Sequence, residues 1–522
     1  MKGLPAETDF VVLGAGIAGL RAAIELAAAG RVLVVAKKQV PQFHAQSPAA
    51  SSTALFSDED EVSLHLQDTL TAGEGLCNPA AVKILVEEGP ERIEELIAWG
   101  RHFDPQHARL VFEPESTHSR SRVLHAPGDS TANEIVRTLA AKVRTLKNIS
   151  CAESVFVTGL IAEDGSVTGI SLMDEKGVPQ QIAASAALVA TGGWGQIYRH
   201  TTNTQTATGD GVAMAYRAGA EVSDLEFVQF HPTALYLRKA PRFPLGEELR
   251  REGAHLRTIE LNRFMAKYHP MGELAPRDVV ARAIIHEMEV SRAKDPFVYL
   301  DLTHLDAAKI RKRFPRIYAT CMQHNIDITE DLIPVRPAAH YAVGGVRTTL
   351  DGNTNIPGLF AAGEVASTGV HGANRLTSNA VLEALVFGAR AGRSMRQALR
   401  SGLKVKTQPT AAYSNGPVDA GIEELIGKIQ DLMWNDVGAV RMRAGMQNSI
   451  RSLEEMSPGL AHPKTRRAYE AAHIHSTALL VARSALAREE SRGPHYRMDY
   501  PDHDDRKFLK HSVVRSESIR FA

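Results

Sequence analysis

The sequence predicts an α/β protein in which a domain built on a parallel sheet is interrupted by an α+β capping domain and followed by a helical domain. Three observations lead to this fold class. Short apolar runs far apart in the sequence end near glycines, the stretch between two of them is rich in charged helical patterns, and helical apolar spacing follows a Pro/Gly/Ser-rich segment. With 522 residues the chain can form about two to four domains.

A β-α-β unit opens the chain. Residues 9–14 form a short apolar run typical of a buried parallel strand, residues 17–29 have helical spacing, and residues 31–36 form a second apolar run. Similar runs at 186–191 and 358–362 are expected to join the same sheet, because strands of one parallel sheet need not be close in sequence.

The domain limits follow from these runs. The expected limits are 1–235 and 343–405 for the first domain, 236–342 for the inserted capping domain and 415–522 for the C-terminal helical domain. Residues 401–417 are expected to form a linker, since they are rich in Pro, Gly, Ser and Thr. The charged last residues are expected either to cover a neighbouring domain or to fray.

Charge and cysteine usage exclude several classes of partner. The chain has 60 Lys+Arg and 60 Asp+Glu, so it lacks the charge excess that binding to nucleic acid or an anionic membrane needs. No apolar run approaches the roughly 18 residues of a membrane span. The three cysteines have no metal-ligand spacing, and the first residues lack the apolar core of a signal peptide. We therefore expect a cytoplasmic protein with no metal, no nucleic-acid partner and no membrane partner.

A GxGxxG motif lies between the first predicted strand and helix, which is the context of dinucleotide binding. Its cofactor-binding residues are Gly14, Ala15, Gly16, Ala18 and Gly19. The first glycine allows the tight turn, the second lets the backbone approach a pyrophosphate, and the third lets helix and strand pack closely. After the second strand, where an acid would bind a ribose hydroxyl, the chain has Lys37. The motif alone does not choose between NAD and FAD.

Two further glycine turns favour FAD. The turn at 190–193, with Thr191 and Gly192, resembles the one that returns to the flavin in flavoproteins with two dinucleotide-binding domains. The segment 361–364 resembles the one whose acid, here Glu364, holds the ribityl chain in those proteins. Three such turns on one sheet predict a Rossmann-like FAD-binding domain.

Five motifs together resemble the signature set of the succinate dehydrogenase/fumarate reductase flavoprotein family. They are QFHPT at 229–233, RREGA at 250–254, GELAPRD at 272–278, PAAHY at 337–341 and HGANR at 371–375. The likeness covers nearly the whole chain and is closest to the members that oxidise L-aspartate. It implies FAD-dependent oxidation of L-aspartate to iminoaspartate, the first step of de novo NAD biosynthesis, with electrons passed to oxygen or fumarate. The following enzyme of NAD synthesis is a candidate partner.

The motifs contain the residues that a dicarboxylate or amino-acid substrate requires. Arg277 and Arg375 offer permanent charge and a planar fork that matches a carboxylate, and His231 and His340 can donate hydrogen bonds to carboxylate oxygens. The resemblance implies that Arg375, His340 and His231 clamp the carboxylates, that Arg277 transfers a proton, and that Glu247 belongs to the catalytic set. Because a guanidinium is a poor base, Arg277 alternatively acts by electrostatic stabilisation.

An acid at Glu115 favours an amino-acid substrate. The resemblance places there a carboxylate that faces the substrate's amino group, and a cation needs an anion nearby. The alternative is a solvated loop glutamate.

The resemblance also implies further cofactor contacts, at Lys37, Ala45, Gln46, Asp210, Asn379 and Leu382. FAD is expected to bind non-covalently, because Pro41 occupies about the place of the family's flavin-linking histidine.

Three short departures from the family pattern leave other functions open. They are Ser47-Pro48, Ser116-Thr117 and Gly246. One alternative is a soluble fumarate reductase or an oxidase of another dicarboxylic amino acid. A second alternative is a catalytically degenerate flavin-binding protein that serves an assembly.

Overall fold

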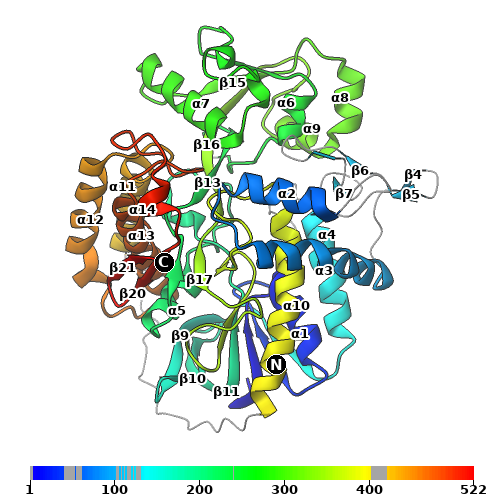
Figure 1. Cartoon of the computed structure of the whole chain (residues 1–522), viewed down its shortest axis with the longest axis vertical. Helices are drawn as coiled ribbons and strands as arrows, with labels where there is room; N and C mark the ends of the chain where they lie inside the picture. The colour runs from blue at the N-terminus through cyan, green and yellow to red at the C-terminus, as the bar shows by residue number, and fades with distance from the viewer. Residues whose placement is uncertain are drawn as a thin grey trace.

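The structure is a computed structural model, and it confirms the predicted fold class. It describes residues 4–39, 53–54, 62–100, 105–106, 109–110, 112–113, 119–120, 123–124, 131–238, 240–400 and 420–522. Figure 1 shows an α/β body, a green cap above it and an orange-to-red helical part at its side. The expected linker at 401–417 lies outside the described residues.

The body contains a sheet for which the described residues supply seven strands. The parallel strands are β8 (Ile149–Ala152), β2 (Val32–Val35), β1 (Glu7–Leu13), β11 (Pro179–Val189) and β18 (Leu359–Ala361). An antiparallel pair, β10 (Ser166–Met173) and β9 (Phe156–Glu163), extends the sheet beside β11. The four apolar runs in the sequence therefore do meet as parallel neighbours.

Both faces of this sheet are covered, which explains the continuous apolar runs. In β1, Phe10 and Val12 point into a core shared with α1 (Ile17–Leu26) and α10 (Asn379–Arg400). The alternate residues Val11 and Leu13 point into a second core, which includes residues of α5 (Asp210–Arg217) and α13 (Arg466–Ala487).

Further elements complete the body. Its other helices are α2 (Val62–Ala72), α3 (Pro79–Ala98) and α4 (Thr131–Arg144), and its short strands are β3 (Thr53–Ala54), β4 (Pro105–Gln106), β5 (Arg109–Leu110), β6 (Phe112–Glu113), β7 (Val123–Leu124), β12 (Val222–Ser223), β17 (Gly345–Arg347) and β19 (Ala366–Ser367). Short 3-10 helices also occur in all three parts of the described chain: Gly195–Ile197 in the body, Met265–Lys267 and Gly272–Leu274 in the cap, and Ser457–Leu460 in the C-terminal part.

The cap is an antiparallel sheet with helices packed on it. The strand order is β13-β16-β15-β14, with β13 (Val228–Leu235), β16 (Ile333–Ala342), β15 (Val298–Asp301) and β14 (His255–Arg257). Its helices are α6 (Glu247–Arg251), α7 (Arg277–Ser291), α8 (Ala307–Arg313) and α9 (Pro315–Met322). Strands β13 and β16 run side by side from the body into the cap (Figure 1). Two histidine motifs lie on this connection.

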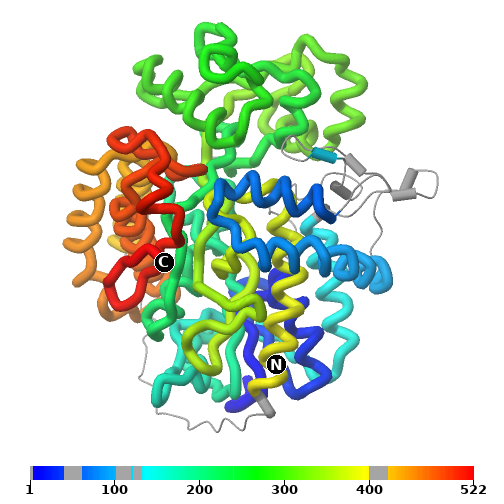
Figure 2. Tube along the Cα trace, viewed as in Figure 1, coloured from blue at the N-terminus to red at the C-terminus, as the bar shows by residue number. Residues whose placement is uncertain are grey.

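The C-terminal part is mainly helical. Its elements are α11 (Ala420–Asp436), α12 (Arg443–Met456), α13, α14 (Asp505–Phe508), β20 (Ser512–Arg515) and β21 (Ser518–Phe521). Strand β20 pairs with β12 of the body, so the last residues cover a neighbour rather than fray. Figure 2 shows this red segment running back from the orange helices to the body.

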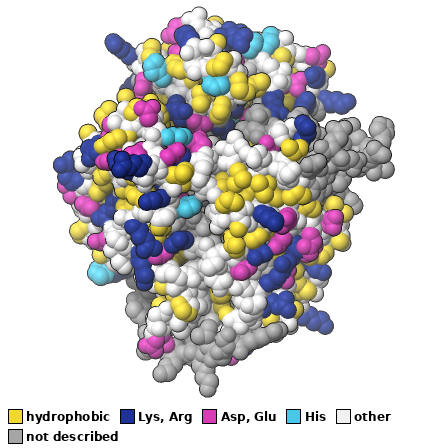
Figure 3. All heavy atoms as spheres, viewed as in Figure 1, with side chains coloured by type: hydrophobic (Ala, Val, Ile, Leu, Met, Phe, Trp, Pro, Cys, Tyr) yellow, Lys and Arg dark blue, Asp and Glu magenta, His cyan; other side chains and the backbone are white. Residues whose placement is uncertain are grey.

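The surface carries charges of both signs. Figure 3 shows Lys and Arg side chains interspersed with Asp and Glu over the viewed face, as the balanced composition predicts. Among the helices that the structure describes, none has the length and apolar character needed to cross a membrane.

A buried ion pair joins the C-terminal part to the body. Glu226, just before β13, accepts a hydrogen bond from Arg488 Nε at 2.6 Å, and both side chains are fully buried. Ser512 Oγ donates to the second oxygen of Glu226 at 2.7 Å. Because donors surround the buried carboxylate and acceptors surround the buried guanidinium, loss of Glu226 would leave a donor of Arg488 unpaired in the core.

We therefore expect Glu226→Ala to lower the free energy of unfolding by about 3 to 5 kcal/mol, since Arg488 would stay buried with one of its two carboxylate partners, Glu490, but without the other. Chemical denaturation followed by circular dichroism measures this change. Glu424→Ala is the control, because Glu424 pairs with Lys428 on the exposed surface of α11. An equal effect of the two substitutions would contradict the role of the buried pair.

Candidate active site

A cavity of about 420 Å³ lies along the carboxyl ends of the parallel strands. The turn after β1, the turn after β11 and Glu364 after β18 all contribute to its wall. The predicted cofactor residues on this wall are Gly14, Ala15, Gly16, Ala18, Lys37, Thr191, Gly192, Asp210 and Glu364. The three glycine turns thus meet at one edge of the sheet, where parallel α/β sheets bind their ligands.

The three motif glycines have three different surroundings. Gly14 has φ +114°, and a Cβ there would lie 2.2 Å from the carbonyl oxygen of Ala190. A Cβ at Gly19 would lie 2.0 Å from the carbonyl oxygen of Gly14. Gly16 is the N-cap residue directly before α1, and no atom of the described residues lies within 4 Å of its Cβ position. These contacts match the turn, the close packing and the ligand approach predicted for the motif, so the residues fit a dinucleotide.

Glu364 is suited to bind a hydroxyl group. Its Oε1 accepts a hydrogen bond from the backbone N–H of Ala342 at 3.1 Å. Burial raises the pKa of Glu364 to about 7, so the carboxyl group is partly protonated at neutral pH. It can therefore both donate and accept a hydrogen bond.

The other predicted cofactor residues are placed differently. Asn379 is buried behind the wall, where its side chain bonds His65 Nε2 at 2.8 Å. Leu382 packs beside Gly89, so it supports the wall from the α3 side. Ala45, Gln46 and Glu115 lie outside the described residues, as do Ser47-Pro48 and Ser116-Thr117.

The substrate-binding candidates gather at the other end of the same cavity. His340 and Arg375 belong to its wall, and the ring of His231 lies against that of His340 with 5.3 Å between centroids. Arg375 NH2 donates to Gln229 Oε1 at 2.9 Å, and its guanidinium lies 4.4 Å from the centre of the Tyr341 ring. These contacts hold a buried cation beside two imidazoles.

Both imidazoles are neutral. Burial lowers the pKa of His231 well below its ordinary value, and the neighbouring His340 and Arg277 lower it further. Burial and the positive charge of Arg375 likewise lower the pKa of His340 well below its ordinary value. The backbone N–H of Thr233 points at His231 Nδ1 at 3.3 Å, so the ring proton is on Nε2. His231 can therefore donate one hydrogen bond from Nε2.

A carboxylate links two arginines behind the histidines. Glu247 Oε2 accepts from Arg277 Nε at 3.1 Å and lies 4.0 Å from Arg250 NH2. Burial opposes ionisation of Glu247, but the charges of Arg277 and Arg250 more than offset it and lower its pKa. Arg250 is 2% exposed and donates to the carbonyl oxygen of Glu273 at 2.6 Å. The sequence motif contained Arg250, but spacing alone did not indicate its contact with Glu247.

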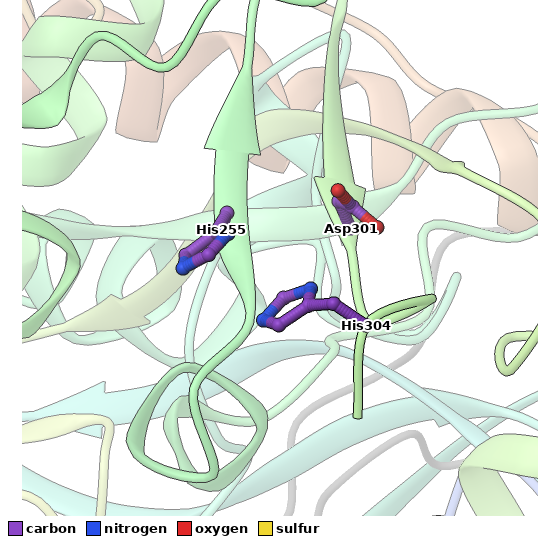
Figure 4. A group of neighbouring side chains, drawn as sticks. All are labelled: His255, Asp301 and His304. Carbon is purple, nitrogen blue, oxygen red and sulfur yellow. The ribbon is translucent and has the colours of Figure 1, made fainter. Parts of the chain in front are cut away.

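The cap also contains a cluster of potential metal ligands, His255, Asp301 and His304 (Figure 4). The two imidazole rings are stacked, with 4.1 Å between centroids and 8° between planes. Because ring lone pairs lie in the ring plane, two nearly parallel rings cannot both point at one ion. The carboxylate oxygens of Asp301 already accept from Arg257 Nε at 2.6 Å and Thr303 Oγ1 at 2.8 Å. We assign no metal to this cluster.

Known proteins similar to this chain are flavoproteins. A family model described as FAD binding domain matches residues 9–381, and one described as fumarate reductase flavoprotein C-term matches 427–521. An L-aspartate oxidase of Nostoc sp. is 39% identical over 98% of this chain and 94% of its own length. One from Streptomyces coelicolor is 40% identical over 97% and 91%. An E. coli quinol fumarate reductase structure has a TM-score of 0.89, with 30% identity over 99% of this chain and 96% of that one.

The glycine surroundings make a testable distinction. We expect Gly16→Ala to leave the unfolding midpoint of the apoprotein nearly unchanged, because its Cβ meets open space, yet to abolish tight dinucleotide binding. Gly19→Ala is the matched control, since its Cβ would collide with the backbone and destabilise the apoprotein itself. Thermal melts and cofactor titration measure the two effects. Tight cofactor binding by Gly16→Ala would show that the backbone makes no close approach there.

Proposed function

The chain belongs to the succinate dehydrogenase/fumarate reductase flavoprotein family, and we propose that it catalyses the FAD-dependent oxidation of L-aspartate to iminoaspartate. The observation that carries this proposal is the similarity to L-aspartate oxidases over nearly the whole chain. The geometry agrees, because a cavity that fits a dinucleotide leads to a pocket of fixed cations and neutral donors.

FAD is the cofactor, and when bound it supplies the two-electron acceptor. The glycine turns, Glu364 and Asp210 line the cavity and would hold FAD there. We also propose that FAD is attached non-covalently, because Pro41 occupies about the place of the family's flavin-linking histidine.

The substrate carboxylates are held by one cation and two imidazoles. Arg375 is fixed by Gln229 and Tyr341, so its fork is ordered before substrate arrives. His231 donates from Nε2, while His340 is held through Nδ1 by the hydroxyl of Thr202 at 2.8 Å. Because both rings are neutral, they add hydrogen bonds without adding charge, and the two carboxylates of the substrate are matched mainly by the arginines.

Arg277 orients and stabilises the reacting end. Its Nε is held by Glu247, which fixes the plane of the guanidinium. The positive charge of Arg277 lowers the pKa of Glu247, and the Nη groups of Arg277 can donate hydrogen bonds as charge shifts on the substrate. Proton transfer by Arg277 is the alternative role that the family resemblance implies.

Finer features remain part of the proposal. Electrons would pass from FAD to oxygen or fumarate, and the product would enter NAD biosynthesis. The enzyme of the following step is a candidate partner. The proposed location is the cytoplasm. The alternative of a fumarate reductase is favoured by one observation, the high structural similarity to a quinol fumarate reductase. The feature that separates the two functions is Glu115, which lies outside the described residues.

An anaerobic spectrum tests the function directly. L-aspartate added to the oxidised holoprotein should bleach the flavin absorbance, whereas succinate should not. Bleaching by succinate alone would favour the dicarboxylate reductase, and bleaching by neither would favour the degenerate flavin-binding protein.

We expect Arg277→Lys to lower turnover by about 100-fold or more, because lysine keeps the charge but loses the planar fork held by Glu247. Flavin content and unfolding midpoint should persist. Arg282→Lys on the same helix is the control. Arg282 pairs with Asp278 at 2.9 Å and not with Glu247. A nearly wild-type rate for Arg277→Lys would remove Arg277 from the reaction.

Glu115→Gln should weaken L-aspartate oxidation far more than fumarate reduction, because only the amino acid brings a cation to that position. A lost charge pair of this kind costs about 2 to 5 kcal/mol. Steady-state rates of both reactions in one variant provide the comparison, and the second reaction controls for general damage. An equal fall in the two rates would make Glu115 structural.

A further inference from the structure

The C-terminal helical part supports two charged residues of the cofactor cavity from outside the cavity. Lys37, after β2, and Asp210, which begins α5, belong to the cavity wall. Lys37 Nζ lies 2.5 Å from Asp210 Oδ2 and 3.4 Å from Glu470 of α13. His473, one turn after Glu470 on the same helix, bonds the other oxygen of Asp210 at 2.9 Å. Glu470 and His473 of α13 therefore contact two charged residues of the cavity wall, Lys37 and Asp210.

The hydrogen bonds determine which nitrogen of His473 carries the proton. Arg217 NH2 lies 2.8 Å from His473 Nε2, and an arginine can only donate, so Nε2 accepts. The proton is therefore on Nδ1 and is donated to Asp210 Oδ1. Burial lowers the pKa of His473 despite the nearby carboxylate, which agrees with a neutral ring. The ring thus has one donor and one acceptor, and both are used.

Asp210 is held as an ionised acceptor. Burial opposes its ionisation, but Lys37 and His473 outweigh burial and lower its pKa. The hydroxyl of Thr208 also donates to Oδ1 at 2.8 Å. The place after β2 where a dinucleotide fold commonly has an acid for the ribose hydroxyls is occupied by Lys37. The ion pair brings the carboxylate of Asp210 to that place from another element.

We propose that His473 is a positioning residue for FAD, which with Glu470 holds Asp210 and Lys37 so that the carboxylate accepts the ribose hydroxyls. The helical C-terminal part thereby completes the cofactor site. This inference rests on the proposed function, because it takes FAD as the ligand of the cavity. Glu470 balances the charge of Lys37 and is itself oriented by Arg467 NH1 at 3.0 Å.

A pair of amide substitutions tests which ring nitrogen matters. The amide nitrogen of asparagine is as many bonds from Cα as Nδ1, and that of glutamine corresponds to Nε2. His473→Asn keeps the donor to Asp210 and should bind FAD within about 3-fold of wild type, whereas His473→Gln should raise Kd at least about 10-fold. Quenching of FAD fluorescence by the apoprotein measures Kd. Both amides remove the ring, so a merely structural role would affect them alike.

His475 provides the matched control. It lies two residues along α13, is also buried, and bonds the carbonyl oxygen of Leu453 at 2.6 Å. We expect His475→Gln to lower the melting temperature of the apoprotein without changing the Kd for FAD. Equal Kd values for His473→Asn and His473→Gln, or an equal loss in His475→Gln, would overturn the positioning role.

A second variant covers the case in which substitution of His473 prevents folding. Glu470→Gln removes a charge beside Lys37 without removing a ring, and should raise Kd for FAD about 3-fold or more. An unchanged Kd would overturn the proposal for α13. If wild-type apoprotein does not bind FAD at all, the proposed function fails. Tight wild-type binding with unaffected variants contradicts only the inference about α13.

Discussion

The parallel register of β1, β11 and β18 is the constraint on which the rest of the structure depends. Parallel neighbours end at the same edge, so each strand delivers its following turn to one cavity. The three turns come from distant parts of the sequence, yet they lie in contact: the Cβ position of Gly14 points at the backbone of Ala190, and that of Gly193 points at the side chain of Glu364. A shift of one strand by one residue would break the backbone contact of Gly14 and the side-chain contact of Gly193, so the sheet and the site specify each other.

The second end of the cavity depends on β13 and β16. These antiparallel strands carry His231 and His340 in the same pairing that joins the cap to the body. Arg277 and Glu247 come from cap helices, whereas Arg375 precedes α10 of the body. The substrate pocket therefore has walls from two parts of the molecule. Movement of the cap would separate the arginines before it disturbed the sheet that holds the cofactor.

Local signals in the sequence were sufficient for the fold class and much of the site. A position that needs positive φ or a close backbone approach can be recognised because it is glycine, and a buried parallel strand can be recognised because its residues are continuously apolar. The pair β9–β10 gave no such signal, because Thr and Gly residues interrupt its apolar positions. Partners such as Arg250 for Glu247, or His473 for Asp210, depend on which helices pack together, and no spacing encodes that. The domain limits remain predictions, and β13 already pairs within the cap sheet before the expected limit at residue 235.

The charge pattern of the pocket argues for a ligand with two carboxylates rather than one. Three arginines, Arg250, Arg277 and Arg375, lie near two neutral imidazoles, while Glu247 compensates part of their charge. Protonated histidines would make the pocket still more positive, and burial without counter-charge makes that state costly. Keeping the rings neutral limits the buried positive charge to an amount that one bound dicarboxylate can offset. The same principle operates at the other end of the cavity, where Asp210 and Glu470 surround Lys37 and His473 stays neutral. At both ends, neutral histidines provide direction and the permanent charges provide the attraction, so the protein fixes the orientation of a ligand without protonating its own imidazoles.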